Sequence, residues 1–199
     1  SSTAAYQAKL AYDKRVTKIM DDLLVELDDF NRNRLNQSII SQHAQQILCN
    51  EGKDFKAAAF LTSSLCEQKG FDGLIQATAF WGKLIQNYGD IAYPSNSEAK
   101  LRTLQSCIDL VTNPEHTNLE EYITLDNQTE QFPVTYTSDE MSLVSNHLAE
   151  IVQEKFSSVK GYDRNELLGG LEQEIDNKAR KFKATEEKSA KDRATKEAQ

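Results

Sequence analysis

Apolar residues recur at steps of three and four along most of this chain, the spacing that places them on one face of an α-helix. The first such run covers about residues 4–30, with Tyr6, Leu10, Val16, Met20, Leu23, Leu27 and Phe30 on that face. After the polar stretch 31–33 the spacing returns from Leu35 to Leu48, and Gly52 can end this second helix. The pattern predicts an all-α protein.

Polar caps and glycines mark the next two helices. Asp54 can cap a third helix that ends at Gly70, because glycine readily adopts the left-handed conformation found at helix ends. Asp72 can cap a fourth helix that ends at Gly89. Pairs of short helices joined by so few residues are typical of an antiparallel bundle.

The fourth helix carries apolar residues around a wide arc. Phe80 and Trp81 are neighbours in sequence and therefore lie about 100° apart around the helix. A helix that buries both is either central to the fold or presents an aromatic patch. Trp81 shares its face with Leu74 and Leu84, which favours the core, but the pair is also a candidate partner-binding surface.

A turn at 93–100 precedes a fifth helix. Ser95 and Glu98 have the spacing of a capping box, in which each side chain satisfies a free backbone donor near the other. The residues expected to point inward from this helix are Leu101, Leu104, Ile108 and Val111. Pro114 ends it, and a short helix is expected within 115–126.

The last two helices have their own start signals. Thr137 with Glu140 forms a second candidate capping box, and Asp163 with Glu166 repeats the pattern. The final helix shows a seam of steps of three and four that resembles a coiled coil and includes Leu168, Leu171, Ile175, Lys178 and Phe182. The complete pattern predicts an irregular bundle of about seven or eight helices with long first and last helices.

Residues 126–138, "DNQTEQFPVTYTS", show β-branched and aromatic residues around a proline and little helical spacing. Long irregular connections in compact domains are often functional. This segment is therefore the first candidate binding loop, with Phe132, Val134 and Tyr136 as the side chains that would contact a partner. A plain connection between helices is the alternative.

The chain has 199 residues, of which 39% are hydrophobic, enough to form a core. We expect a single helical domain over 1–182, with a sub-division near 90–97 or 126–138 as the alternative. Residues 183–199 hold no large apolar side chain, which predicts a charged, solvated helical extension. The first helix begins close to Ser1 without a clear cap, which favours a fragment of a larger protein.

Charge is distributed unevenly around a formal net value of -8. From Lys178 onward eight Lys and Arg stand against four Asp and Glu, so the rest of the chain is strongly acidic. An acidic body argues against nucleic acid as a partner, since phosphate binding needs clustered cations. The basic stretch 179–183 could contact an anionic membrane, but a solvated face is the simpler interpretation and no membrane contact is expected.

Cysteine usage favours a reducing compartment. Cys49, Cys66 and Cys107 are an odd, widely spaced set without a C-x-x-C pair. We interpret them as buried free thiols in a cytoplasmic protein. His43 and Cys49 are six positions apart and would face different sides of one helix, so they do not form a catalytic pair within it. Burial is the simpler explanation for both.

Few signals of catalysis are present. The motifs of phosphate-binding loops, zinc proteases and serine hydrolases do not occur. Glu140, His147 and Glu154 are spaced by seven residues and lie near one helical stripe, which makes them weak candidates for a metal site. Exposed polar residues on an amphipathic helix are the simpler interpretation, and no cofactor is expected.

These observations favour a protein–protein interaction module, an adaptor or regulator that binds another protein through helical surfaces. A regulator of a switch protein such as a small GTPase would fit this class. The first alternative is a metal-dependent or acid–base enzyme that uses the Glu/His helix face. The second is a coiled-coil structural spacer. The oligomeric state is left open.

Overall fold

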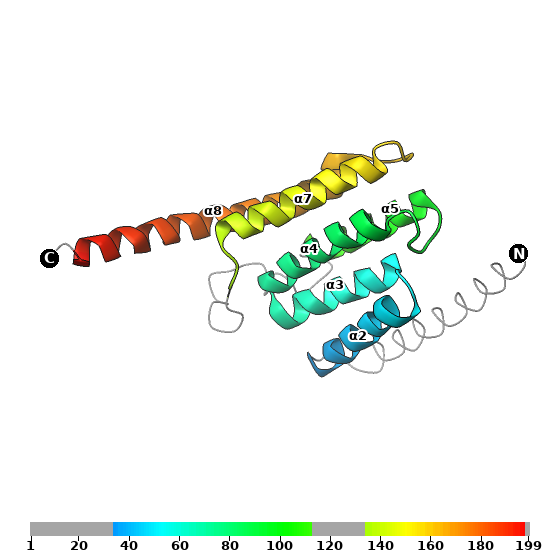
Figure 1. Ribbon diagram of the computed structural model, residues 1–199, viewed down its shortest axis with the longest axis horizontal. Helices are drawn as coiled ribbons and strands as arrows, with labels where there is room; N and C mark the ends of the chain where they lie inside the picture. The colour runs from blue at the N-terminus through cyan, green and yellow to red at the C-terminus, as the bar shows by residue number, and fades with distance from the viewer. Residues whose placement is uncertain (1–33, 113–133, 198–199) are drawn as a thin grey trace, which may run out of the picture.

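The computed structural model describes residues 34–112 and 134–197, which are mostly helical (Figure 1). No strand forms within these ranges, and the one β-bridge joins Asp54 to Tyr93. The elements are α2 (Arg34–Gln46), the π-helical turn η1 (Ile47–Glu51), α3 (Phe55–Lys69), α4 (Phe71–Tyr88), α5 (Ser97–Thr112), α7 (Ser138–Phe156) and α8 (Arg164–Glu197). The predicted all-α class is confirmed.

The predicted number of helices is slightly too high for the described ranges. These ranges contain six α-helices and one π-helical turn, against the seven or eight predicted. The helices predicted at 4–30 and 115–126 fall outside the residues that the structure describes.

Five of the helices close a ring around a common core. α3 packs on α4, α4 on α7, α7 on α8, α8 on α5, and α5 on α3 again. α2 packs on α3 from outside this ring. Figure 1 shows α7 and α8 side by side along one edge of the molecule, with α4 and α3 beneath them and α2 at the opposite edge.

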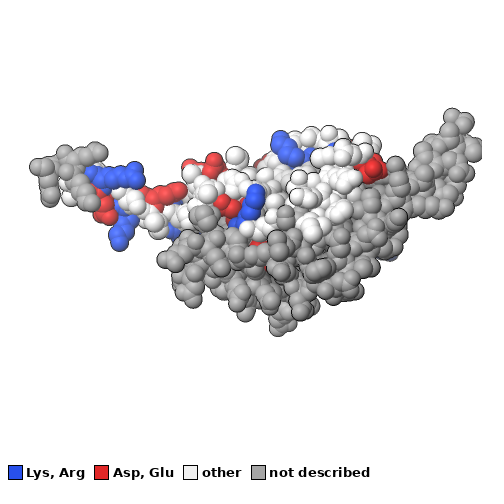
Figure 2. All heavy atoms as spheres, turned by 90° about the horizontal axis from the view of Figure 1, so that it is seen from below, with Lys and Arg blue, Asp and Glu red and all other residues white. Residues whose placement is uncertain are grey.

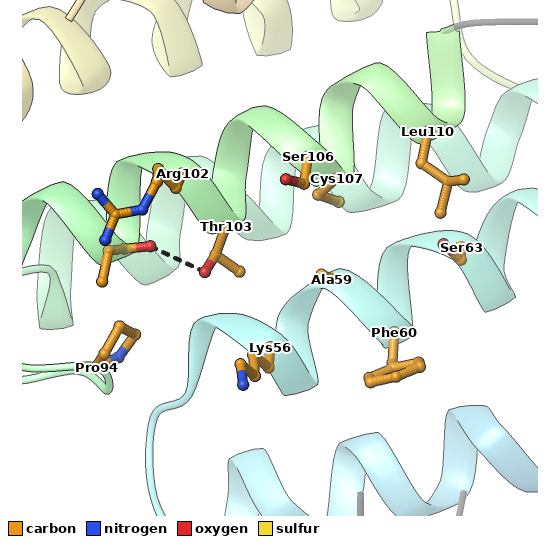
Figure 3. A pocket seen from close by; sticks show the side chains of 11 residues that line it. Lys56, Ala59, Phe60, Ser63, Pro94, Arg102, Thr103, Ser106, Cys107 and Leu110 are labelled. Atoms are coloured by element: carbon orange, nitrogen blue, oxygen red, sulfur yellow. Dashed lines mark hydrogen bonds between the residues drawn. The ribbon is translucent and has the colours of Figure 1, made fainter. Parts of the chain in front are cut away.

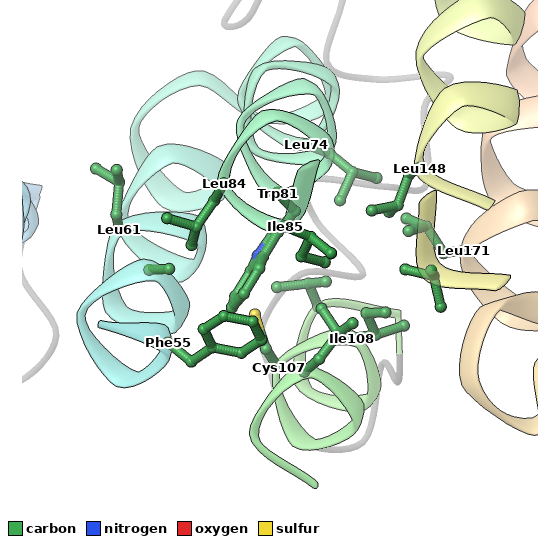
Figure 4. Close-up of a cluster of buried hydrophobic side chains, with 14 of the residues drawn as sticks. Phe55, Leu61, Leu74, Trp81, Leu84, Ile85, Cys107, Ile108, Leu148 and Leu171 are labelled. Carbon is green, nitrogen blue, oxygen red and sulfur yellow. The ribbon is translucent and has the colours of Figure 1, made fainter. Parts of the chain in front are cut away.

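Three aromatic side chains, those of Phe55, Trp81 and Phe156, pack together in the core that the helices enclose. Phe55 meets Trp81 edge-on with ring centroids 5.1 Å apart, and meets Phe156 in the same way at 6.4 Å. The indole N–H of Trp81 donates to the Thr62 hydroxyl at 2.8 Å. Aliphatic side chains from α4, α5, α7 and α8 complete the core, among them Leu84, Ile85, Ile108, Leu148 and Leu171 (Figure 4).

Most of the predicted helix starts are confirmed by their hydrogen bonds. The Asp54 carboxylate accepts from the backbone N–H of Ala57 at 2.9 Å. Thr137 and Glu140 make the complete reciprocal capping box at the start of α7. The Asp163 carboxylate accepts from the N–H of Glu166 at 3.0 Å. These signals depend only on residues close together in sequence, so they can be recognised without the fold.

Two predicted caps are wrong. α5 begins after Asn96, whose side-chain oxygen accepts from the N–H of Ala99 at 2.9 Å, so Ser95 is not the cap. Asp72 lies inside the first turn of α4 rather than before it, because the helix already begins at Phe71.

A π-helical turn ends the α2 segment and changes which side chains are buried. The N–H of Gly52 donates to the carbonyl of Ile47, five residues earlier, at 2.9 Å. The wider turn shifts the helical phase. Cys49 lies within this turn and is exposed, so its predicted burial is wrong. His43, which precedes the turn in α2, is half-buried.

The predicted burial of the other two cysteines is confirmed. Cys66 and Cys107 are free thiols in the core. Burial raises the pKa of Cys66, and the nearby Cys107 raises it further. Burial also raises the pKa of Cys107 to about 12, although hydrogen bonds to Thr62 and Trp81 act in the opposite direction.

α8 is one continuous helix of 34 residues with two different environments. Leu171 and Ile175 of the predicted seam are buried, and so is Lys178. The Lys178 ammonium lies 5.5 Å from the ring centre of Phe71 and 5.3 Å from that of Phe182, a cation–π arrangement that allows lysine in an apolar seam.

Beyond Phe182 the side chains of α8 are exposed through residue 195. This part extends away from the body (Figure 1), and Figure 2 shows both signs of charge interspersed along it. A domain boundary at 182 stays a prediction. No helix in the described ranges is long and apolar enough to cross a membrane.

Deletion of residues 184–199 is expected to change the free energy of unfolding by less than about 1 kcal/mol, because no large apolar group would be uncovered. Within the described residues, a hydrogen bond from the Ser138 hydroxyl to the Glu186 carboxylate, at 3.0 Å, joins this segment to the body. Urea unfolding of both chains, followed by circular dichroism at 222 nm, checks this. A larger loss would show that the extension stabilises the body.

Alkylation with iodoacetamide near pH 8 is expected to label Cys49 rapidly and to leave Cys66 and Cys107 unmodified until urea is added. The reason is that only a thiolate reacts, and burial keeps these two thiols protonated. Peptide mass spectrometry over time identifies the modified residues. Rapid labelling of Cys107 in native buffer would show that this thiol becomes accessible without unfolding of the protein.

Candidate protein-binding site

An apolar groove of about 590 Å³ lies between α3 and α5 (Figure 3). Its walls come from one face of each helix, and the loop before α5 closes one end. The lining residues are Lys56, Ala59, Phe60, Ser63, Pro94, Ala99, Arg102, Thr103, Ser106, Cys107 and Leu110.

The spacing of residues on the two helices produces the groove. On α5, Ala99, Arg102, Thr103, Ser106 and Leu110 follow steps of three, four and seven, so they share a face. The neighbouring face of α5 points into the core. Figure 3 shows that α3 and α5 run in the same direction along the groove.

Small side chains leave the space open, and larger apolar ones give it an apolar surface. Ala59, Ser63 and Ser106 fill little volume between the helices. Phe60 is half-buried, and Leu110 remains 38% exposed. The Thr103 hydroxyl donates to the carbonyl of Ala99 at 2.9 Å, so its polar group is already satisfied within the helix.

Charge is concentrated at one end of the groove. Lys56 and Arg102 lie there beside Pro94, while Phe60 and Leu110 lie toward the other end (Figure 3). Among the described residues that line the groove, none is acidic. The Glu98 carboxylate lies 3.8 Å from the Arg102 guanidinium in an exposed pair one helical turn away.

Lys100 holds the charged end of the groove in place. Its side chain is buried, and its ammonium donates to the carbonyl of Gly89 at 2.6 Å. This bond joins the start of α5 to the end of α4, where free carbonyls favour a cation. Burial lowers the pKa of Lys100, and Asp90 acts in the opposite direction.

The aromatic pair predicted as a second binding surface is divided by the fold. Trp81 is 2% exposed and belongs to the core, as its shared face with Leu74 and Leu84 indicates. Phe80 is half-buried and packs against the same core. The wide apolar arc therefore reflects a central helix.

The predicted binding loop is only partly described. Phe132 lies outside the described residues, while Val134 and Tyr136 are half-buried and pack against the core. Between them, Thr135 donates its backbone N–H and its hydroxyl to the Asp72 carboxylate, at 3.1 and 2.6 Å. This end of the loop is therefore fixed on the first turn of α4.

The candidate metal ligands do not come together. Glu140 is used in the capping box, and Glu154 is exposed. The Nε2 atom of His147 is buried beside α4 and has no hydrogen-bond partner in the structure. Across the described ranges, no group of three or more His, Cys, Asp or Glu could hold a metal ion. A spacing of seven residues places side chains on the same face of a helix but two turns apart, too far from one another to bind one metal ion.

The sequence contains a weak signal for the groove, at Leu110. Leu110 lies next to the inward residue Val111 but off the face formed by Leu104 and Ile108. A large apolar residue off the inward face indicates either a second contact or an open surface. The position of α3 beside α5 shows that Leu110 lies at an open surface, the groove between the two helices.

Comparison with known proteins identifies a family. The family model described as "ImpA, N-terminal, type VI secretion system" matches residues 4–110, more than half of the chain. No curated protein and no solved structure matches. All the residues that line the groove fall within the matched range, whereas α7 and α8 lie beyond it. The chain belongs to the ImpA N-terminal family of the type VI secretion system.

Proposed function

We propose that this chain is a protein-binding module of a type VI secretion assembly and that the α3–α5 groove is its docking surface. The observation that carries the proposal is the open apolar groove of about 590 Å³ within the family-matched part of the chain. Exposed apolar surface of this kind is costly in water and commonly marks an interaction site.

The shape of the site supports a protein partner. Two helices with small residues between them form the type of groove in which proteins bind the apolar side of another helix. The Thr103 hydroxyl is bonded within its own helix, so it is already satisfied without a ligand. Leu110 and Phe60 offer apolar contact area.

No residue of the groove supports the more specific function of a small-GTPase regulator, so we propose protein binding alone. The charged extension of α8 lacks a seam beyond Phe182, so it offers no surface for coiled-coil pairing. The free, buried thiols of Cys66 and Cys107 support a reducing cytoplasmic setting.

Replacement of Leu110 by Asp is expected to weaken partner binding by about 2 kcal/mol or more, because a charge would enter the apolar docking surface. The partner is first captured from a lysate of the source organism and then purified. Its affinity for the wild type and for Leu110→Asp is measured by calorimetry, with circular dichroism to check the fold.

Leu143→Asp is the matched control. Leu143 is a second exposed leucine, 69% exposed on α7 and outside the groove, so the same chemical change there should leave the affinity unchanged. Equal affinities for the wild type and a folded Leu110→Asp would remove the groove from consideration. Equal losses for both variants would point to a general effect of added charge.

A further inference from the structure

The charge at one end of the groove contrasts with the rest of the chain. The described lining residues include Lys56 and Arg102 and no carboxylate, although the chain has a net charge of -8. Both cations are exposed, Lys56 in the first turn of α3 and Arg102 in the second turn of α5. This end is therefore complementary to a negatively charged group.

The helix termini add to this asymmetry. α3 begins at Phe55 and α5 at Ser97, so the positive ends of both helix dipoles lie at the same end of the groove as the two cations (Figure 3). The Asp54 carboxylate caps α3 and offsets part of its positive end. Asn96, which caps α5, is neutral, but Glu98 in the first turn of α5 offsets part of the positive end of that helix.

The dimensions of the groove suit a short helix. From Ala99 to Leu110 the α5 wall covers eleven residue steps, about 16 Å at 1.5 Å per residue. A bound helix would place about three turns along this wall and present apolar side chains to it from one face. A peptide could not bind here by extending a sheet, because the described part of the chain contains no strand.

We propose, on the basis of the function above, that the groove binds an amphipathic helix of a partner protein that carries carboxylates in its last turn. The bound helix lies antiparallel to α3 and α5. Its apolar face contacts Phe60 and Leu110, and its C-terminal carboxylates reach Lys56 and Arg102. This orientation also places the negative end of its dipole against the positive ends of α3 and α5.

The test uses three synthetic peptides of about 15 residues, which are long enough to span the groove. All three carry the same leucine face. The first has glutamates in its last turn, the second has them in its first turn, and the third has lysines in its last turn. Each carries a fluorescent label and is titrated with the 199-residue protein by anisotropy, at low and at physiological salt.

The first peptide is expected to bind about threefold or more tightly than the others at low salt, a typical effect of exposed charge pairs. The advantage should shrink as salt is added, because salt screens exposed charges. Arg102→Gln and Lys56→Gln should each reduce it. Glu98→Gln should increase it, because that carboxylate competes for Arg102.

Arg180→Gln is the matched control for the cation variants. Arg180 is exposed on α8 and does not line the groove, so its loss should leave the order of the three affinities unchanged. Leu110→Asp should weaken all three peptides, which shows that they occupy the groove.

The outcomes separate this inference from the proposed function. One alternative result is that the three peptides bind equally to the wild type and fail to bind Leu110→Asp. That result would overturn the proposed carboxylate contacts and helix orientation but leave the groove as a docking site. Absence of binding by every peptide would overturn a helical occupant of this class. Dimerisation measured by light scattering and abolished by Leu110→Asp would show that the groove holds a second copy of the chain instead.

Discussion

The hydrogen bond from the Trp81 indole to Thr62 determines how the central helices meet. An indole N–H in an apolar core is costly unless it has an acceptor, and Thr62 supplies one from α3 at 2.8 Å. The Thr62 hydroxyl in turn donates to the Ala58 carbonyl at 2.8 Å. With α3 and α4 fixed in this way, Phe55 contacts Trp81 on one side and Phe156 of α7 on the other. The ring of helices is built around these contacts.

The close approach of α4 and α7 follows from the same arrangement. Gly82, the residue after Trp81, faces the His147 ring so closely that a Cβ atom at position 82 would lie 2.9 Å from its Cδ2. α3 is covered by α4 on one side and by α2 on another. The side of α3 toward α5 is left with small residues, and the groove forms there.

The sequence allowed prediction of features that depend on local spacing and failed where they depend on neighbours. Asp54 and the Thr137–Glu140 box were predicted because a cap and its partner lie three residues apart. The predicted cap at Ser95 is one residue too early, because the spacing of a capping box alone does not fix the residue at which α5 begins. Cys49 was placed in the core because a π-helical turn has no reliable pattern in a single sequence. The groove could not be predicted, because it exists only where α5 comes to lie beside α3.

The backbone hydrogen bonds of α8 are expected to open in different ways in the two parts of this helix. Up to Phe182, its amide hydrogens belong to a helix that packs on both α5 and α7, so exchange with deuterium there requires the ring of helices to separate. Past that point the same hydrogen-bonded backbone has no buried side chains through residue 195, and its amides can exchange by fraying from the end. Protection should therefore fall steeply within about two turns of a helix that shows no break in its geometry.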